Sequence, residues 1–250
     1  MDKGIRSDHK KLGLKALNGA QTVAAVSHAL KESLQPIINN DIQVLPNFID
    51  TALFRPLSNT KVDKKRKTIE LVSVGDLIER KNISLGLRTL KELSKVHNVK
   101  YTIVGDGKER DALRHLAQQL EISSAVTFTG KLEKHEVATI LNRSNVLLHC
   151  SKLETFGLVV IEALCCGLFV VSTPSKGVDM MKNCDGLFIS QDHSIESIKK
   201  EMESVIDLIS KTKSTELRST ISSKAKEAYD VKGYLKKYEK VIGPFYKEKG

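Results

Sequence analysis

Between residues 68 and 189, short apolar runs alternate with amphipathic stretches of helical length. The runs are rich in Val, Ile and Leu, as buried strands are, and the stretches carry apolar residues at helical spacing. Strands and helices in this order build right-handed β-α-β units, which share one parallel sheet. The predicted strands are Thr68–Val74, Lys100–Val104, Ala125–Thr129, Asn145–His149, Phe169–Ser172 and Leu187–Ile189. The predicted helices between them are Asn82–Val96, Lys108–Leu120, Lys134–Arg143, Gly157–Cys166 and Val178–Asn183. We therefore predict an α/β fold with a Rossmann-like parallel sheet flanked by helices.

The segments before and after this series predict further elements. Thr22–Val26 and Ile42–Leu45 are typical of strands, and the helix expected between them, near Ser27–Ile38, has Ser27 as a plausible N-cap. The polar and basic segment Ser58–Lys67 is typical of a linker. From Ile195 onward the chain is predicted to be helical, and its last helix is expected over Tyr234–Tyr246.

Charge and composition narrow the classes of partner. The net charge of +10 favours polyanions, with nucleotide phosphates and an anionic membrane surface as the leading candidates. Only 5% of the 250 residues are aromatic and Trp is absent, so nucleic-acid binding through stacked bases is not expected. The start of the chain lacks the apolar core of a secretory signal. We expect a cytoplasmic protein, and peripheral contact with the inner face of the membrane stays open.

One apolar run, Gly157–Val171, resembles part of a membrane span. It is shorter than the ~20 residues that a spanning helix needs, and Glu162 lies inside it. A buried helix followed by a buried strand explains the run better.

The cysteines and histidines do not suggest a metal site. None of the four cysteines forms a C-x-x-C pair, and Cys150, Cys165 and Cys166 lie in apolar surroundings, as core thiols do. The seven histidines show neither an H-x-x-x-H pair nor clustering with cysteine. We expect reduced structural thiols, no metal ion and no cofactor.

In an open parallel sheet, ligands bind at the carboxyl ends of the strands. The first predicted strand ends at Gly75, and Arg80 and Lys81 follow just before a helix. A helix start offers free backbone N–H groups and a positive dipole end, so this segment suits a diphosphate. Two solvated cations in a loop are the alternative.

The next two strands also end at glycines. Gly105 opens a Gly105-Asp106-Gly107 turn, but Arg110 stands where a dinucleotide fingerprint has its third glycine. A tight turn is therefore favoured over NAD binding. The third strand runs into Gly130-Lys131-Leu132, where a glycine lets a flat ligand approach the backbone.

The most informative segment follows the fourth strand. Glu154 falls in a loop at the strand tip, and Glu162 lies eight positions later inside a helix that is apolar on every side. A carboxylate buried there needs a partner, and the chain offers no Arg or Lys one turn away. Phe156-Gly157-Leu158 would present helix-start N–H groups to an anion. The element could therefore hold a sugar at Glu154, a phosphate on the backbone and a ribose at Glu162, unless a distant residue satisfies Glu162.

These segments resemble the carboxyl-terminal domain of family-four retaining glycosyltransferases, which have the two-Rossmann-domain GT-B architecture. That family has a Glu–Phe–Gly element with a second Glu eight residues after the first. The Glu–Phe–Gly element and its second Glu are matched by Glu154, Phe156, Gly157 and Glu162. The helix, turn and V-V strand that follow are matched by Ala163, Gly167, Val170 and Val171. The end of the family's first strand is matched by Gly75, Lys81 and Asn82, and its interdomain segment by residues 46–56. The resemblance covers about residues 20–230.

The resemblance implies a metal-independent transfer from a nucleotide sugar of the UDP or GDP type, with retention of configuration. It implies that Glu154 contacts the transferred sugar, Glu162 the ribose and Lys81 the diphosphate. Glu154 and Lys81 are the predicted catalytic residues. The predicted donor-binding residues are Gly75, Arg80, Lys81, Gly105, Gly130, Lys131, Leu132, Glu154, Phe156, Gly157, Leu158 and Glu162. The acceptor stays unknown.

The chain departs from the family pattern in three places. Asp76 follows Gly75 where the family has Arg, and Arg80 is the candidate replacement. Phe48 replaces a glycine after Asn47, and the Gly-Gly-x-x-Glu turn reads Ser175-Lys176-Gly177-Val178-Asp179. Donor preference could differ for that reason.

The family also has an amino-terminal Rossmann domain that binds the acceptor. We predict that residues 1–57 are the remnant of that domain plus a linker, 58–230 the nucleotide-sugar-binding domain, and 231–250 a terminal crossing helix. A separate amino-terminal-domain partner is one way to complete the enzyme. Two alternatives stay open: a nucleotide-sugar 2-epimerase, and a non-catalytic nucleotide-sugar-binding subunit of a split enzyme.

Overall fold

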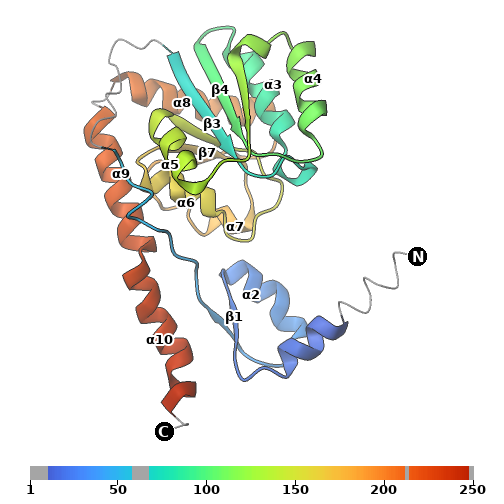
Figure 1. Cartoon of the computed structure of the whole chain (residues 1–250), viewed down its shortest axis with the longest axis vertical. Helices are drawn as coiled ribbons and strands as arrows, with labels where there is room; N and C mark the ends of the chain where they lie inside the picture. The colour runs from blue at the N-terminus through green and yellow to red at the C-terminus, as the bar shows by residue number, and fades with distance from the viewer. Residues whose placement is uncertain (1–10, 58–67, 212–213, 248–250) are drawn as a thin grey trace. The chain divides into compact units, whose positions relative to one another are not determined.

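The computed structural model describes residues 11–57, 68–211 and 214–247. The chain forms two compact units, one of residues 1–48 with 231–250 and one of residues 49–230 (Figure 1). The larger unit begins after Phe48, whereas the sequence suggested a boundary after Leu57. The chain returns to the smaller unit at Val231, which is also where the terminal helix was predicted to begin. The predicted linker Ser58–Lys67 lies outside the described residues.

The larger unit is built on a six-stranded, wholly parallel sheet. Its strands are β3 (Thr68–Val74), β4 (Asn98–Val104), β5 (Val126–Gly130), β6 (Val146–His149), β7 (Phe169–Ser172) and β8 (Leu187–Ile189). Their order in the sheet is β5-β4-β3-β6-β7-β8, so the chain reverses its direction of travel between the neighbours β3 and β6. The predicted Rossmann-like α/β fold is confirmed, and the β3/β6 junction is its topological switch point.

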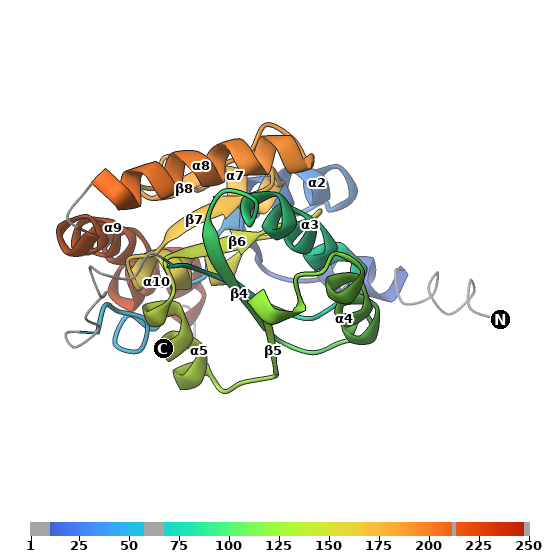
Figure 2. The ribbon, with the colours of Figure 1, turned by 90° about the horizontal axis from the view of Figure 1, so that it is seen from above.

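Helices cover both faces of this sheet. Helices α3 (Ile83–Leu93), α4 (Arg110–Gln119) and α8 (Ile195–Lys211) lie on one face (Figure 2). Helices α5 (Lys134–Arg143), α6 (Leu158–Cys165) and α9 (Ser214–Tyr229) lie on the other. Two short helices sit at strand ends, η2 (Glu79–Lys81) after β3 and α7 (Lys176–Asp179) after β7. Helix α7 starts two residues before the helix predicted at Val178.

The core lies between the sheet and its helices. Every residue of β6 and β7 is buried, as is usual for central strands of a parallel sheet that is covered on both faces. The run Gly157–Val171 contains the whole of α6 and the first three residues of β7, so the predicted helix followed by a strand is confirmed. Cys150, Cys165 and Cys166 are buried in this core. In the part of the chain that the structure describes, no helix is both long enough and apolar enough to cross a membrane.

The smaller unit holds a two-stranded parallel sheet of β1 (Val23–Ala25) and β2 (Ile42–Val44). Helix α2 (His28–Leu34) connects them, and the predicted N-cap is confirmed because Ser27 Oγ accepts a hydrogen bond from the Leu30 N–H at 3.2 Å. A 3-10 turn, η1 (Gln35–Ile37), follows α2. The apolar core of this sheet is formed by Val23, Ala25, Ile38 and Ile42.

Helix α10 (Val231–Lys247) is the terminal helix that the sequence predicts. Tyr234 lies in its first turns, 4.8 Å from the Phe48 ring and 6.0 Å from the Tyr238 ring, measured between ring centroids.

Candidate functional site

The candidate site lies at the carboxyl ends of β3 and β6. The chain leaves β3 through Gly75 into η2, and it leaves β6 into a loop over residues 150–157. Backbone and side chain join the two segments: Lys152 N–H donates to the Arg80 carbonyl at 2.8 Å, and Arg80 Nη1 donates to the Leu153 carbonyl at 3.0 Å. Residues that are far apart in the sequence are thus held together at the switch point, where open α/β sheets bind ligands.

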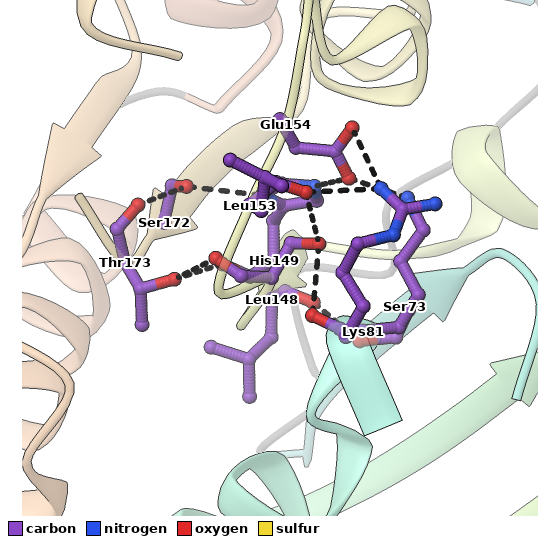
Figure 3. A network of polar contacts seen from close by, with 10 residues as sticks. Ser73, Lys81, Leu148, His149, Leu153, Glu154, Ser172 and Thr173 are labelled. Atoms are coloured by element: carbon purple, nitrogen blue, oxygen red, sulfur yellow. Dashed lines mark hydrogen bonds and ion pairs between the residues drawn. The ribbon is translucent and has the colours of Figure 1, made fainter. Parts of the chain in front are cut away.

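Four ionisable side chains converge at this point: Glu154, Lys81 and His149, which Figure 3 labels, and Arg80. The Glu154 carboxylate accepts a short hydrogen bond from Lys81 Nζ, and His149 Nε2 lies 3.3 Å from Glu154 Oε1. Arg80 Nη1 is 3.9 Å from the other carboxylate oxygen. Burial by itself would raise the pKa of Glu154, but the His149 and Lys81 side chains lower it to about 2. Glu154 is therefore a carboxylate throughout the physiological pH range.

The loop that carries Glu154 is fixed from behind. Gly177 N–H donates to the Glu154 carbonyl at 3.1 Å. A Cβ atom at Gly177 would lie 2.6 Å from that carbonyl oxygen and 2.7 Å from the Phe156 nitrogen, so only glycine fits at this close approach. The Phe156 ring is 2% exposed and meets the Tyr229 ring edge-on, with centroids 6.2 Å apart. The Phe156 side chain is thus an anchor, and only its backbone can meet a ligand.

The amino terminus of α6 offers unpaired backbone donors. Gly157 precedes the helix with a φ of 76°, a left-handed conformation that favours glycine. Among the described residues, no hydrogen bond is formed by the N–H groups of Phe156, Gly157 or Leu158. Such a helix start attracts an anion through its free donors and its dipole.

Glu162 is less buried than predicted. The sequence suggested a helix enclosed on all sides, but α6 has an open face formed by Leu158, Val159 and Glu162, with Leu158 44% exposed. The prediction of an enclosed helix was wrong because α6 has apolar residues on its exposed side as well as on its buried side. Within the described parts of the chain, the Glu162 carboxylate has no hydrogen-bond or ion-pair partner. Partial burial raises its pKa, and the more distant charge of Lys134 only lessens the effect.

The predicted glycines line the neighbouring strand ends. The Gly75 Cβ position would meet the Lys81 side chain at 3.4 Å, so Lys81 lies directly over this backbone. Gly105 N–H donates to the Gly130 carbonyl at 2.8 Å, which links the ends of β4 and β5. The Gly130 Cβ position faces open space. Lys131 is exposed and Leu132 is half-buried.

The turn after β4 is closed by its own residues, in keeping with the tight turn favoured from the sequence. Asp106 accepts a hydrogen bond from Gly107 N–H at 2.8 Å and pairs with Arg110 at 2.9 Å. Its side chain is thus already engaged within the turn.

Sequence reasoning missed His149 and its partner Ser172. His149 Nδ1 lies 3.0 Å from Ser172 Oγ, and the Ser172 hydroxyl donates to the Thr173 carbonyl at 2.9 Å. A signal was present, because each is a polar residue at the end of an otherwise apolar strand. Among the described residues, no group of three or more His, Cys, Asp or Glu side chains is arranged to hold a metal ion.

Comparisons with known proteins identify the family of this chain. A sequence model of the family described as glycosyl transferases group 1 matches residues 55–228. N-acetyl-alpha-D-glucosaminyl L-malate synthase of Bacillus anthracis is 30% identical over 165 residues, which cover 64% of this chain and 43% of that protein. The phosphatidylinositol N-acetylglucosaminyltransferase gpi3 subunit of Schizosaccharomyces pombe is 31% identical over 160 residues, covering 62% of this chain and 34% of that protein. The chain therefore spans less than half the length of these relatives.

Solved structures show the same fold at lower identity. HepE of Anabaena in complex with UDP and glucose superposes with a TM-score of 0.80 at 19% identity, covering 94% of this chain and 66% of that one. Sucrose-phosphate synthase of Thermosynechococcus elongatus gives 0.81 at 17% identity, with 97% and 61% covered. The predicted relation to GT-B architecture is confirmed by these likenesses.

Proposed function

The chain belongs to the glycosyl transferases group 1 family, and from that membership we propose that it binds a nucleoside diphosphate sugar and transfers the sugar to an acceptor with retention. The donor-binding residues would be those at the ends of β3, β4, β5 and β6. The acceptor would meet the donor from a second domain, as in the two-domain GT-B architecture.

One arrangement carries the proposal: a cation, a helix start and two carboxylates lie along a single edge of the sheet. Lys81, with Arg80 beside it, and the free N–H groups before α6 suit a diphosphate. The unpaired Glu162 carboxylate suits the two hydroxyls of a ribose, since hydroxyls donate to both oxygens. Glu154 is ionised and lies beside Lys81. It would accept hydrogen bonds from hydroxyls of the transferred sugar.

A uridine donor is supported by a likeness to a solved structure, because HepE of Anabaena has been solved with UDP and with UDP-glucose. In this chain, the open space over Gly130 and the half-buried Leu132 would suit a flat base at the end of β5. That space suits uracil and guanine alike, so both UDP and GDP belong in the test.

The experiment is titration calorimetry of the purified chain with UDP and with GDP, in buffer containing EDTA. Binding of one nucleotide without added metal is the expected result. If neither binds at millimolar concentration, the proposal fails.

The two carboxylates should divide their roles between the parts of the donor. Glu154→Gln should leave the affinity for the free nucleoside diphosphate unchanged. It should weaken binding of the intact nucleotide sugar by roughly 1.5–3 kcal/mol, the usual value of a hydrogen bond to a charged group. Glu162→Gln should weaken both ligands, because both contain the ribose. Calorimetry with UDP and UDP-glucose, or GDP and GDP-mannose, measures the difference. An equal loss in both variants for both ligands would contradict the assignment.

A further inference from the structure

His149 is a buried imidazole at the site that the proposed function leaves unused. It is the last residue of β6, directly opposite Ser172 in the register of β7. Its side chain is 5% exposed, with Nδ1 3.0 Å from Ser172 Oγ and Nε2 3.3 Å from Glu154 Oε1 (Figure 3). The ring therefore lies between a fixed position in the sheet and the Glu154 carboxylate, and its buried Nε2 is close to Oε1 without a formed hydrogen bond to any described residue.

The Ser172 hydroxyl shows where the protons of this ring lie. While it donates its single proton to the Thr173 carbonyl at 2.9 Å, it can only accept from Nδ1–H in the contact with His149. A neutral ring protonated only on Nδ1 would turn the Nε2 lone pair toward a carboxylate, which is repulsive. A second proton on Nε2 removes the repulsion and creates a charge-assisted contact. When the hydroxyl instead donates to Nδ1, the neutral ring carries its proton on Nε2. Both orientations of the hydroxyl therefore favour a hydrogen on Nε2.

The backbone around His149 is tied to the residue that follows β7. Thr173 N–H donates to the His149 carbonyl at 2.9 Å, and Thr173 Oγ1 donates to the Ser151 carbonyl at 2.9 Å. The Lys and Arg side chains that face Glu154 from the described residues are Lys81 and Arg80, both on η2. The proposed function assigns these two to the diphosphate. When the phosphates engage them, His149 is the partner that stays with the carboxylate.

We infer that His149 is a positioning residue for Glu154: it presents an Nε2–H to the carboxylate and keeps it ionised and oriented while the donor sugar is bound. The ligand-binding part of this inference rests on the proposed function. The proton on Nε2 does not, because the contacts that require it belong to the protein alone.

Nitrogen NMR of the histidine side chains tests the proton directly in the free protein. The His149 signals are assigned by their loss in His149→Asn. We expect Nε2 of His149 to carry a proton at pH 7, either in an imidazolium or in the Nε2–H tautomer. A bare Nε2 between pH 6 and pH 8 would overturn the inference. This result is obtained even if no nucleotide binds, so it is separate from the fate of the proposed function.

Two matched variants test the positioning role. The amide nitrogen of Gln is as many bonds from the backbone as Nε2, and that of Asn as many as Nδ1. His149→Gln can therefore still donate to Glu154, whereas His149→Asn can donate only toward Ser172. His149→Asn should lower the affinity for the nucleotide sugar about tenfold. The nucleotide sugar used is whichever of UDP-glucose, UDP-N-acetylglucosamine and GDP-mannose binds the wild type. UDP or GDP binding should stay within about twofold of the wild type, which corresponds to less than ~0.5 kcal/mol.

His149→Gln should retain most of the affinity for the nucleotide sugar. Equal losses for nucleotide and nucleotide sugar in His149→Asn would show a purely structural role and overturn the inference. Wild-type affinity for both ligands in His149→Asn would overturn it as well, as would equal weakening of the nucleotide sugar in the Gln and Asn variants.

Discussion

At the scale of single residues, the site shifts the pKa values of two carboxyl groups in opposite directions. Glu154 has cationic neighbours that overcome its burial and lower its pKa to about 2. Glu162 has no paired cation among the described residues, so partial burial raises its pKa above 4.5. Opposite shifts within one site are typical of groups with different tasks. Glu154 is already satisfied by the protein, whereas Glu162 gains when a ligand supplies donors.

Replacing Glu162 should therefore separate stability from binding. A raised folded-state pKa means that protonation favours the folded state, so stability falls as the pH rises from 4.5 through that pKa. The Gln side chain of Glu162→Gln does not ionise, so this variant escapes the loss of stability. It should melt at the same or a higher temperature than the wild type at pH 7. Its affinity for UDP or GDP should nevertheless fall by roughly 1.5–3 kcal/mol. Thermal unfolding and calorimetry at pH 7 measure both quantities. A lower melting temperature would show that Glu162 has a stabilising partner.

At the scale of elements, the Glu154 loop depends on α7 approaching it closely at Gly177. Gly177→Ala would place a methyl group against two backbone atoms of the loop, at 2.6 and 2.7 Å. We expect a loss of ~1–3 kcal/mol in unfolding free energy, as for other overpacked sites, and weaker binding of the intact nucleotide sugar. Gly243→Ala is the matched control, because its Cβ in α10 meets nothing within 4 Å. Denaturant unfolding and calorimetry compare the two. Wild-type stability in Gly177→Ala would show that the loop can move aside.

Helix α10 has an exposed face suited to an anionic membrane. Val231 and Leu235 are exposed, with Leu235 at 48%, and exposed lysines flank them at positions 232, 236, 237 and 240. Apolar side chains between lysines are typical of helices that lie on a membrane surface. We predict flotation with liposomes that contain acidic lipid, and little flotation with neutral ones. Each lysine at the surface contributes about 1 kcal/mol, so Lys236→Glu with Lys240→Glu should greatly reduce it. Flotation that is independent of acidic lipid would contradict this prediction.

Most strands and helices were predictable from the sequence. The contacts within the candidate site were predictable only in part. Strands β3, β7 and β8 have the predicted bounds, because apolar runs and helical periodicity are local signals. The candidate residues after β3 and β6 were found because parallel topology brings strand ends together. The Lys81–Glu154 pair and the role of Ser172 depend on register and side-chain packing between distant segments, which no local pattern encodes. The exposure of Glu162 was misjudged because an apolar helix face can remain uncovered.

At the scale of the whole molecule, the question is how much of the reaction this chain can perform. Sugar transfer needs donor and acceptor held with their reacting atoms about 3–3.5 Å apart, in a site closed to water. Under the proposed function the described site supplies only donor-binding groups, and the chain spans 43% of its Bacillus relative. We therefore expect the 250-residue chain to bind donor but to release nucleoside diphosphate very slowly. A longer form, or a separately encoded amino-terminal domain, should restore turnover.

The assay follows release of nucleoside diphosphate from several nucleotide sugars with a broad set of acceptors. Addition of a separately expressed amino-terminal Rossmann domain of a relative is the complementation arm. Robust turnover by the purified chain alone would show that its own amino-terminal residues suffice for acceptor binding.

The pairing of Lys81 with Glu154 has a consequence for the order of events in a catalytic cycle. Under the proposed function, Lys81 would keep contact with a phosphate while Glu154 turns to the hydroxyls of the sugar. An intact nucleotide sugar would then supply partners to both groups. Once the sugar had been transferred, the remaining nucleotide would still meet Lys81 but would offer nothing to Glu154. The site would therefore hold its substrate more tightly than its product.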